Sequence, residues 1–170
     1  PYYEQQNPFE RAFATHKMKI ECVMIDTGCD PKAWFKAACH VADISNHTAH
    51  ATLNYRTPLE ARDGETPDIS ALCNFKFWEL VYFRKHPKYD FPGKGGNEGL
   101  GRWLGRAIDH GDKMCYHILD VNTQEIIVRS MVRSAETTTR PNAGLMSKLL
   151  ECQQQDAVTR LRGGNCPLIT

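Results

Sequence analysis

Glu10 is the acidic residue whose setting in the sequence suggests a chemical role. It comes three positions after Asn7, and Asn7 precedes Pro8, so the glutamate falls in the first turn of an expected helix. A glutamate at that position can close a capping box by reaching back to the N–H of the cap residue. Residues 57–60 repeat the pattern as T-P-L-E. On local evidence alone, capping is therefore favoured over a catalytic carboxylate.

Basic side chains recur at positions suited to binding a polyanion. Arg11, Lys17 and Lys19 follow Glu10 on the same expected helix, and Lys17, seven positions on, returns close to the Glu10 face. A second group occupies the middle of the chain: Lys76, Arg84, Lys85, Lys88, Lys94, Arg102, Arg106, Arg129 and Arg133. These side chains could contact the phosphates of DNA without reading its sequence, and the alternative is an ordinary solvated surface.

Composition sets broad limits on the kind of protein. The chain has 170 residues, 41% of them hydrophobic, so it can bury a core. Residues 1–72 hold seven Lys and Arg against ten Asp and Glu, a net charge of −3, whereas residues 73–135 hold ten against seven, a net charge of +3. No apolar run is long enough to span a bilayer and no basic-then-apolar leader is present. We therefore expect an intracellular protein that is neither secreted nor membrane-bound.

Cysteine and histidine patterns give no sign of a metal centre. The seven cysteines are odd in number and include no C-x-x-C pair, so we expect reduced thiols that pack as small hydrophobic groups in a reducing compartment. His47 and His50 have the H-x-x-H spacing of metal ligands, but no cysteine pair follows at a zinc-site spacing. The two histidines are expected at an exposed helix end.

The first 70 residues should be helical. An N-cap residue precedes a proline at three places: Asn7-Pro8, Asp30-Pro31 and Thr57-Pro58. We expect helices over residues 8–26 and 31–50, and a short third helix that Asp63-Gly64 ends. The expected buried stripes are Phe9, Phe13, Ile20, Val23 and Met24 on the first helix, and Trp34, Ala38, Val41 and Ile44 on the second.

The middle of the chain should form strands. Runs rich in aromatic and β-branched residues cover 75–84, 100–108, 114–121 and 125–134, so four or five short antiparallel strands should build a small β-barrel. Trp78 and Trp103 are expected to pack in its core. If Ile126, Val128 and Val132 face that core, Arg129 and Arg133 share the opposite face. The expected fold class is therefore α+β.

The remainder, residues 136–170, is expected to be a linker followed by a loosely attached helix. Its weak apolar stripe runs through Met146, Leu149, Leu150, Ala157 and Leu161, and Gly163-Gly164 ends it.

Several segments resemble one family in the order in which the family carries them. Residues 5–11, Q-Q-N-P-F-E-R, resemble the N-x-x-E-R signature at the end of copia-type retrotransposon integrase cores. Residues 45–47 (S-N-H), 55–61 (Y-R-T-P-L-E-A) and 64–70 (G-E-T-P-D-I-S) continue the resemblance. Residues 132–135, V-R-S-A, are similar to the last barrel strand of copia-like elements from algae such as diatoms. The resemblance covers about residues 1–135.

The resemblance implies a polynucleotidyl transferase assembled from several segments. Residues 1–50 would be the helical end of a ribonuclease H-like catalytic core, 51–72 a connector, and 73–135 an SH3-like DNA-binding barrel. Glu10 would be the third catalytic carboxylate, and two aspartates outside the chain would complete a site for Mg²⁺ or Mn²⁺. The family further implies binding to element ends and target DNA, self-association, and passage from a cytoplasmic particle to the nucleus.

Two alternatives stay open at this point. The chain could be a non-enzymatic module that binds nucleic acid or a protein partner through its small barrel, because fold does not fix function. It could also be the remnant of a decayed element. Under the integrase hypothesis itself, this fragment is not expected to be active alone.

Overall fold

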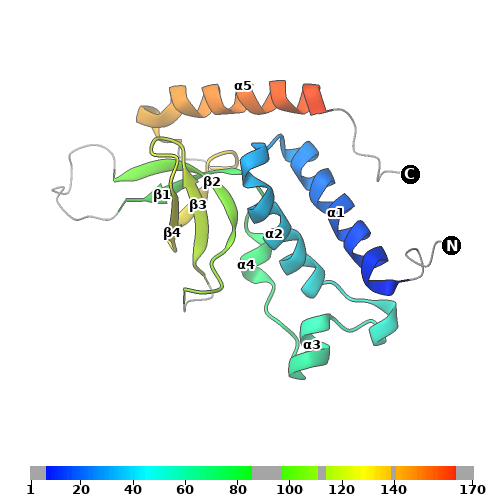
Figure 1. Cartoon of the computed structure of the whole chain (residues 1–170). Coiled ribbons are helices and arrows are strands. Elements are labelled where there is room, and N and C mark those ends of the chain that lie inside the picture. Colours follow the sequence, from blue (N-terminus) through cyan, green and yellow to red (C-terminus); the bar gives the residue numbers. More distant parts are fainter. Residues whose placement is uncertain (1–6, 86–96, 111–113, 139–140, 164–170) are drawn as a thin grey trace.

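The computed structural model describes residues 7–85, 97–110, 114–138 and 141–163 of the chain. Helices precede and follow a five-stranded antiparallel sheet (Figure 1), so the α+β class is confirmed. The helices are α1 (Pro8–Thr27), α2 (Trp34–Asn46), α3 (Pro58–Asp63), α4 (Ser70–Cys73) and α5 (Met146–Gly163), with short 3₁₀ helices η2 (Pro31–Ala33), η3 (Ala51–Leu53) and η4 (Ala143–Leu145). The strands are β1 (Leu80–Arg84), β2 (Glu98–Arg106), β3 (Tyr116–Asp120), β4 (Ile126–Arg129) and β5 (Val132–Ser134).

Local signals set both ends of α1. The Asn7 side chain accepts a hydrogen bond from the Phe9 N–H at 3.0 Å, and Pro8 fits the first helical position because an N–H there would have no helical partner. The helix ends at Gly28, whose φ of 66° is a left-handed conformation that glycine adopts without a Cβ clash. The helix expected over residues 8–26 is therefore confirmed.

The second expected helix is shorter than its pattern suggested. A 3₁₀ turn precedes α2, and α2 itself ends at Asn46. Trp34 and Ile44, which were expected to be buried, are 58% and 42% exposed. The residues buried on α2 are Ala37, His40 and Val41. This shift turns the buried face toward the sheet, because His40 meets the edge of the Trp103 ring of β2 with ring centroids 5.3 Å apart.

The sheet has the strand order β4-β3-β2-β1-β5. Its outermost strands, β4 and β5, are separated in the chain only by Ser130 and Met131. At that bend the Arg84 N–H donates to the Met131 carbonyl at 3.2 Å, so the bend lies against the end of β1. Pairing between β4 and β5 is not seen among the described strands, which therefore form an open sheet.

β1 begins at Leu80, later than the aromatic run over residues 75–84 indicates. Trp78 has a φ of 66°, which is rare for a bulky side chain and interrupts the extended backbone. Its N–H donates to the Trp103 carbonyl at 2.8 Å, so the residue is held against β2 by the fold around it. Both tryptophans are buried, which confirms that they pack in the core.

Apolar side chains cover both faces of the sheet. One cluster consists of Ala71, Val81, Phe83, Trp103, Tyr116 and Ile118. A second consists of Leu80, Tyr82, Leu100, Ala135, Leu149 and Cys152, and a third of Cys29, Ala37, Phe77, Trp78 and Leu104. Successive residues of β1 alternate between the first two clusters, which explains why its sequence is apolar at almost every position. On β4, Ile127 packs against the first cluster while Ile126 is 50% exposed, so the condition under which Arg129 and Arg133 would share a face is not met. Arg129 lies opposite Tyr116 of the first cluster, whereas Arg133 lies opposite Tyr82 of the second.

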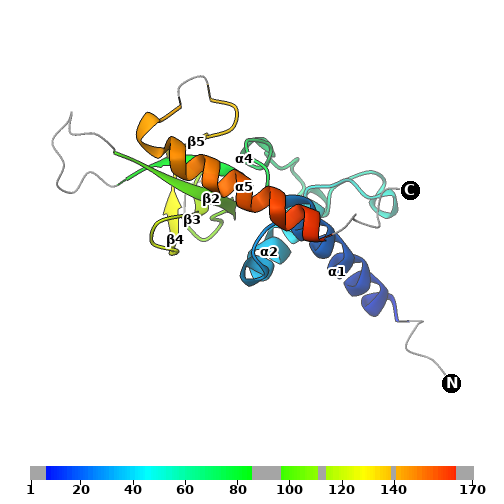
Figure 2. The ribbon, with the colours of Figure 1, turned by 90° about the horizontal axis from the view of Figure 1, so that it is seen from above.

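Helix α5 lies across one face of the sheet (Figures 1 and 2). Leu149 and Cys152 are buried there against β1 and β2. Arg102 of β2 forms an ion pair with Asp156 of α5 at 2.6 Å. The expectation of a loosely attached helix is therefore wrong, because a core cluster and a buried ion pair hold α5 to the sheet.

The cysteines are mostly free thiols. Five of them, Cys29, Cys39, Cys73, Cys115 and Cys152, are free. Cys22 is disulfide-bonded, so the expectation of reduced thiols fails at that position. Burial raises the pKa of Cys29 to about 11, which keeps its thiol protonated at neutral pH.

Within the described ranges, no helix combines the length and the apolar character needed to cross a membrane.

Candidate nucleic-acid interface

Glu10 lies in the first turn of α1, which is exposed to solvent. Asn7 caps this helix through the Phe9 N–H, and the Glu10 carboxylate makes no hydrogen bond or ion pair with any described residue. The reach back to the cap residue that defines a capping box is therefore not formed. In α3 the Thr57 hydroxyl accepts from the Glu60 N–H at 3.1 Å, so capping is observed there. The Glu10 carboxylate is free to bind a ligand from solution.

The cations of α1 are also exposed. Arg11 and Lys19 project into solvent, and Lys17 lies 4.0 Å from Glu21 with both side chains largely exposed. Exposed pairs of this kind contribute little to stability, so Lys17 remains available to a phosphate. The same end of α1 exposes Phe9 and Phe13, by 74% and 63%, although both were expected to be buried.

A two-metal site cannot be completed from the described residues. No group of three or more His, Cys, Asp or Glu side chains is arranged there to hold a metal ion. Two-metal phosphoryl transfer requires several carboxylates that converge on the ions. Glu10 could therefore supply one ligand to the pair of metals that the resemblance implies, and no further group of ligands is found among the described residues.

The second basic group gathers where β1 ends. Arg84 and Lys85 are exposed, and the Arg129 Nε–H donates to the Arg84 carbonyl at 3.2 Å. A hollow of about 530 Å³ opens beside them. It is lined by Tyr82, Arg84, Asn97, Glu98, Met131, Val132 and Arg133. No carboxylate of the described chain forms an ion pair with Arg84, whose guanidinium contacts only the Met131 sulfur, at 3.7 Å.

Arg133 is the second arginine of the hollow. Its guanidinium pairs with Glu98, with nitrogen–oxygen distances of 2.9 and 2.8 Å, and stacks over the Tyr82 ring at 4.6 Å from the centroid. The hydrogen bond from Arg133 lowers the pKa of Glu98, so the carboxylate stays ionised at neutral pH. The Asn142 amide donates to the same carboxylate at 3.0 Å, which ties the segment before η4 to this end of the sheet.

Arg102 was expected to bind DNA, but it belongs to the interior. The residue is 6% exposed, its guanidinium donates to Asp156 at 2.6 Å, and it lies 5.0 Å from the centroid of the Trp78 ring. Asp156 already neutralises its charge inside the fold. Its role is to join β2 to α5.

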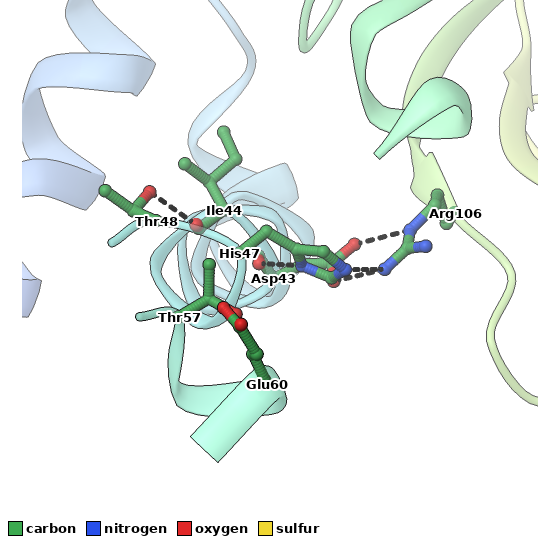
Figure 3. A network of polar contacts seen from close by, with 7 residues as sticks. All are labelled: Asp43, Ile44, His47, Thr48, Thr57, Glu60 and Arg106. Atoms are coloured by element: carbon green, nitrogen blue, oxygen red, sulfur yellow. Dashed lines mark hydrogen bonds and ion pairs between the residues drawn. The ribbon is translucent and has the colours of Figure 1, made fainter. Parts of the chain in front are cut away.

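Arg106 is likewise committed to an internal network (Figure 3). Its guanidinium donates two hydrogen bonds to the Asp43 carboxylate, at 2.9 and 2.6 Å, and approaches His47 Nε2 at 3.3 Å. His47 Nδ1 lies 2.7 Å from the Asp43 carbonyl. The His47 side chain is 6% exposed, so the expectation of an exposed helix end is wrong for this histidine. The network fastens the end of α2 to β2.

The remaining expected DNA contacts are scattered. Lys76 is exposed in the turn before β1, where its N–H donates to Glu79 at 2.8 Å. Lys88 and Lys94 lie outside the described residues. The beginning of α1, with Glu10, and the end of β1, with Arg84, lie at opposite ends of the molecule in both Figure 1 and Figure 2. The structure therefore gathers Arg84, Lys85, Arg129 and Arg133 together but leaves the α1 residues apart from them.

Two features of this interface escaped the sequence pattern. Tyr82 lines the hollow, and Glu98, which was not among the expected site residues, holds the guanidinium of Arg133. In the sequence, only strand alternation indicated that Tyr82 belongs with Arg84, since the two are two residues apart and share a face.

Searches with protein-family models, among curated proteins and among solved structures found no match to this chain.

Proposed function

We propose that this chain is the C-terminal part of a copia-type retrotransposon integrase, in which Glu10 supplies one catalytic carboxylate and the sheet binds DNA. The observation that carries the proposal is the Glu10 carboxylate in the first turn of α1, which is exposed and has no partner among the described residues, at the glutamate of the N-x-x-E-R-like segment. Had Glu10 closed a capping box, its position would have been explained without chemistry. The ordered motifs over residues 5–135 supply the class of reaction.

The finer fold forms part of the same proposal. α1 and α2 would be the closing helices of a ribonuclease H-like core. The sheet would be a partly open SH3-like barrel, because Arg129 of β4 and the Met131 carbonyl both bond to Arg84 of β1. In such a barrel, these two bonds would help to hold β4 near β1 around the first apolar cluster.

The chemistry requires residues beyond those described here. In the complete integrase, bound Mg²⁺ or Mn²⁺ would activate the attacking oxygen and stabilise the leaving one. The part assigned to this chain is narrower: Glu10 contributes a ligand oxygen, and Lys17 on the neighbouring surface holds a DNA phosphate. The proposed partners are element ends, target DNA and further copies of the integrase, acting in the nucleus.

The test is a substitution in the full-length integrase that contains this chain. Glu10→Gln keeps the shape of the side chain but removes its charge, so strand transfer should fall by at least about 100-fold because a metal ligand is lost. DNA affinity and thermal stability should stay at wild-type values, because Glu10 is exposed and has no partner among the described residues. Strand transfer would be measured with labelled element ends and a target duplex.

Glu21→Gln is the matched control. Glu21 is also an exposed glutamate of α1, three helical turns further on, and it should retain wild-type strand transfer. Full strand transfer by the Glu10→Gln protein would exclude the integrase assignment. In that case, DNA binding by the sheet would favour a non-enzymatic nucleic-acid-binding module.

A further inference from the structure

The hollow at the end of β1 is built from one face of the sheet. Tyr82 and Arg84 alternate along β1, Tyr82 lies opposite Arg133 of β5, and Arg84 lies opposite Glu98 of β2. Side chains at opposed positions of neighbouring strands project on the same side. This face continues the one that α5 covers, and the hollow begins where that cover ends.

The Tyr82 hydroxyl has no hydrogen-bond partner in the described chain. The residue is 1% exposed, and it lines the hollow. A buried hydroxyl without a partner is destabilising, so such groups normally meet an acceptor. An acceptor bound in the hollow would satisfy the hydroxyl.

The charges of the hollow select the kind of acceptor. Arg84 and Arg133 carry positive charge, and the ionised Glu98 offsets the charge of Arg133 through their two hydrogen bonds. One uncompensated positive charge, that of Arg84, therefore remains on the lining. A phosphodiester carries a single negative charge and offers acceptor oxygens to both a guanidinium and a hydroxyl.

We propose that the hollow binds one phosphodiester of a DNA backbone, with the Arg84 guanidinium as its cation and the Tyr82 hydroxyl as a hydrogen-bond donor. The proposal rests on the DNA-binding function proposed above and locates a built contact within it. Arg133 has a positioning role: it stacks on the Tyr82 ring and is itself held by Glu98. Because a phosphodiester is common to every DNA sequence, the contact contributes affinity without sequence preference.

The experiment measures the affinity of the 170-residue chain for a fluorescent duplex of arbitrary sequence over a range of NaCl concentrations. Arg84→Gln should reduce the magnitude of the slope of log affinity against log salt by about one, because one phosphate contact is lost. Tyr82→Phe removes only the hydroxyl, so it should weaken binding by about 3- to 10-fold at fixed salt with little change in slope. Its melting temperature should not fall.

Lys32→Gln is the matched control for charge, since Lys32 is an exposed cation on η2, outside the lining of this hollow. The Lys32→Gln protein should keep the DNA affinity of the wild type and the same slope of log affinity against log salt. A second probe, dimethyl phosphate, should shift the NMR signal of the Arg84 side chain in the wild type and not in Arg84→Gln, and it should perturb Tyr82 as well.

The outcomes separate the two proposals. If the wild type binds DNA with a steep salt dependence while Tyr82→Phe and Arg84→Gln behave like the wild type, the phosphodiester site is wrong and the DNA-binding function stands. If the wild type does not bind DNA, both proposals fail. Binding of dimethyl phosphate with no effect of either substitution on DNA affinity would also overturn the site, because the hollow would then take a small anion without serving DNA.

Discussion

At the scale of single residues, His40 is an ionisable side chain enclosed by aromatic rings. It is 8% exposed, stacks on Phe77, and meets the edge of Trp103 with centroids 5.3 Å apart. Its Nδ1 has no partner among the described residues. Burial lowers the pKa of His40 below 6.5, because the imidazolium would lose its hydration. The folded state therefore favours the neutral ring.

This environment predicts a loss of stability in mild acid. The unfolded chain takes up a proton near pH 6.5, whereas folded His40 does so only at lower pH, so stability is fully present above 6.5 and falls as pH decreases toward the folded pKa. The loss for one histidine is at most about 1.4 kcal/mol per pH unit. We expect His40→Phe, or His40→Leu if the larger ring does not fit, to reduce the fall in melting temperature between about pH 7.5 and 5.5.

His117 should account for part of the remaining pH dependence, because burial and the nearby Lys36 also lower its pKa. His50→Gln is the control, since His50 is exposed, and it should keep the wild-type profile. An identical pH profile for wild type and the His40 variants would show that the buried ring does not control acid stability.

Residue roles could be read from the sequence only where the partner is close by in the chain. Asn7 and Thr57 act within their own helices, and both were expected as caps. The arginines differ, because the acids that bind Arg102 and Arg106 lie 54 and 63 residues away. A basic residue on a strand gives no sign of such a partner, so expected DNA contacts and internal ion pairs could not be distinguished in advance.

At the scale of elements, α5 shows how a weak pattern can hide a firm attachment. Its sequence is mostly polar, and only a narrow stripe with Leu149 and Cys152 reaches the sheet. That stripe is sufficient because Leu80 and Leu100 present an apolar surface to it. The existence and the end of the helix followed from local signals, whereas its docking depended on a face of the sheet that strand alternation did not identify.

Neighbouring leucines of α5 test this docking. Leu149 is 5% exposed and Leu150 is 51% exposed, so alanine at the first position should leave a cavity and alanine at the second should not. We expect Leu149→Ala to lower the free energy of unfolding by about 2–4 kcal/mol, and Leu150→Ala to lower it by less than about 1 kcal/mol. Urea denaturation followed by circular dichroism would measure both. Equal and small losses would mean that α5 is not part of the cooperative core.

At the scale of the whole molecule, the two groups of functional candidates lie at opposite ends. The beginning of α1, the helix that carries Glu10, lies at one end, and the end of β1, the strand that Arg84 closes, lies at the other (Figures 1 and 2). Under the proposed function, the first end would meet the reacting phosphate and the second would hold DNA elsewhere along the duplex. If the sheet alone binds DNA, replacing Arg11, Lys17 and Lys19 of α1 with neutral residues should leave most of the affinity for DNA intact.

The most direct test of this account is the salt dependence of DNA binding by the unmodified chain. Arg84, Lys85 and Arg129 gather at one end of the sheet, whereas Glu98 offsets the charge of Arg133, so we expect about three phosphate contacts. The plot of log affinity against log salt for duplex DNA of arbitrary sequence should then have a slope of about −2.7. Absence of binding at low salt, or an affinity that does not change with salt, would contradict the proposal that this surface binds the DNA backbone.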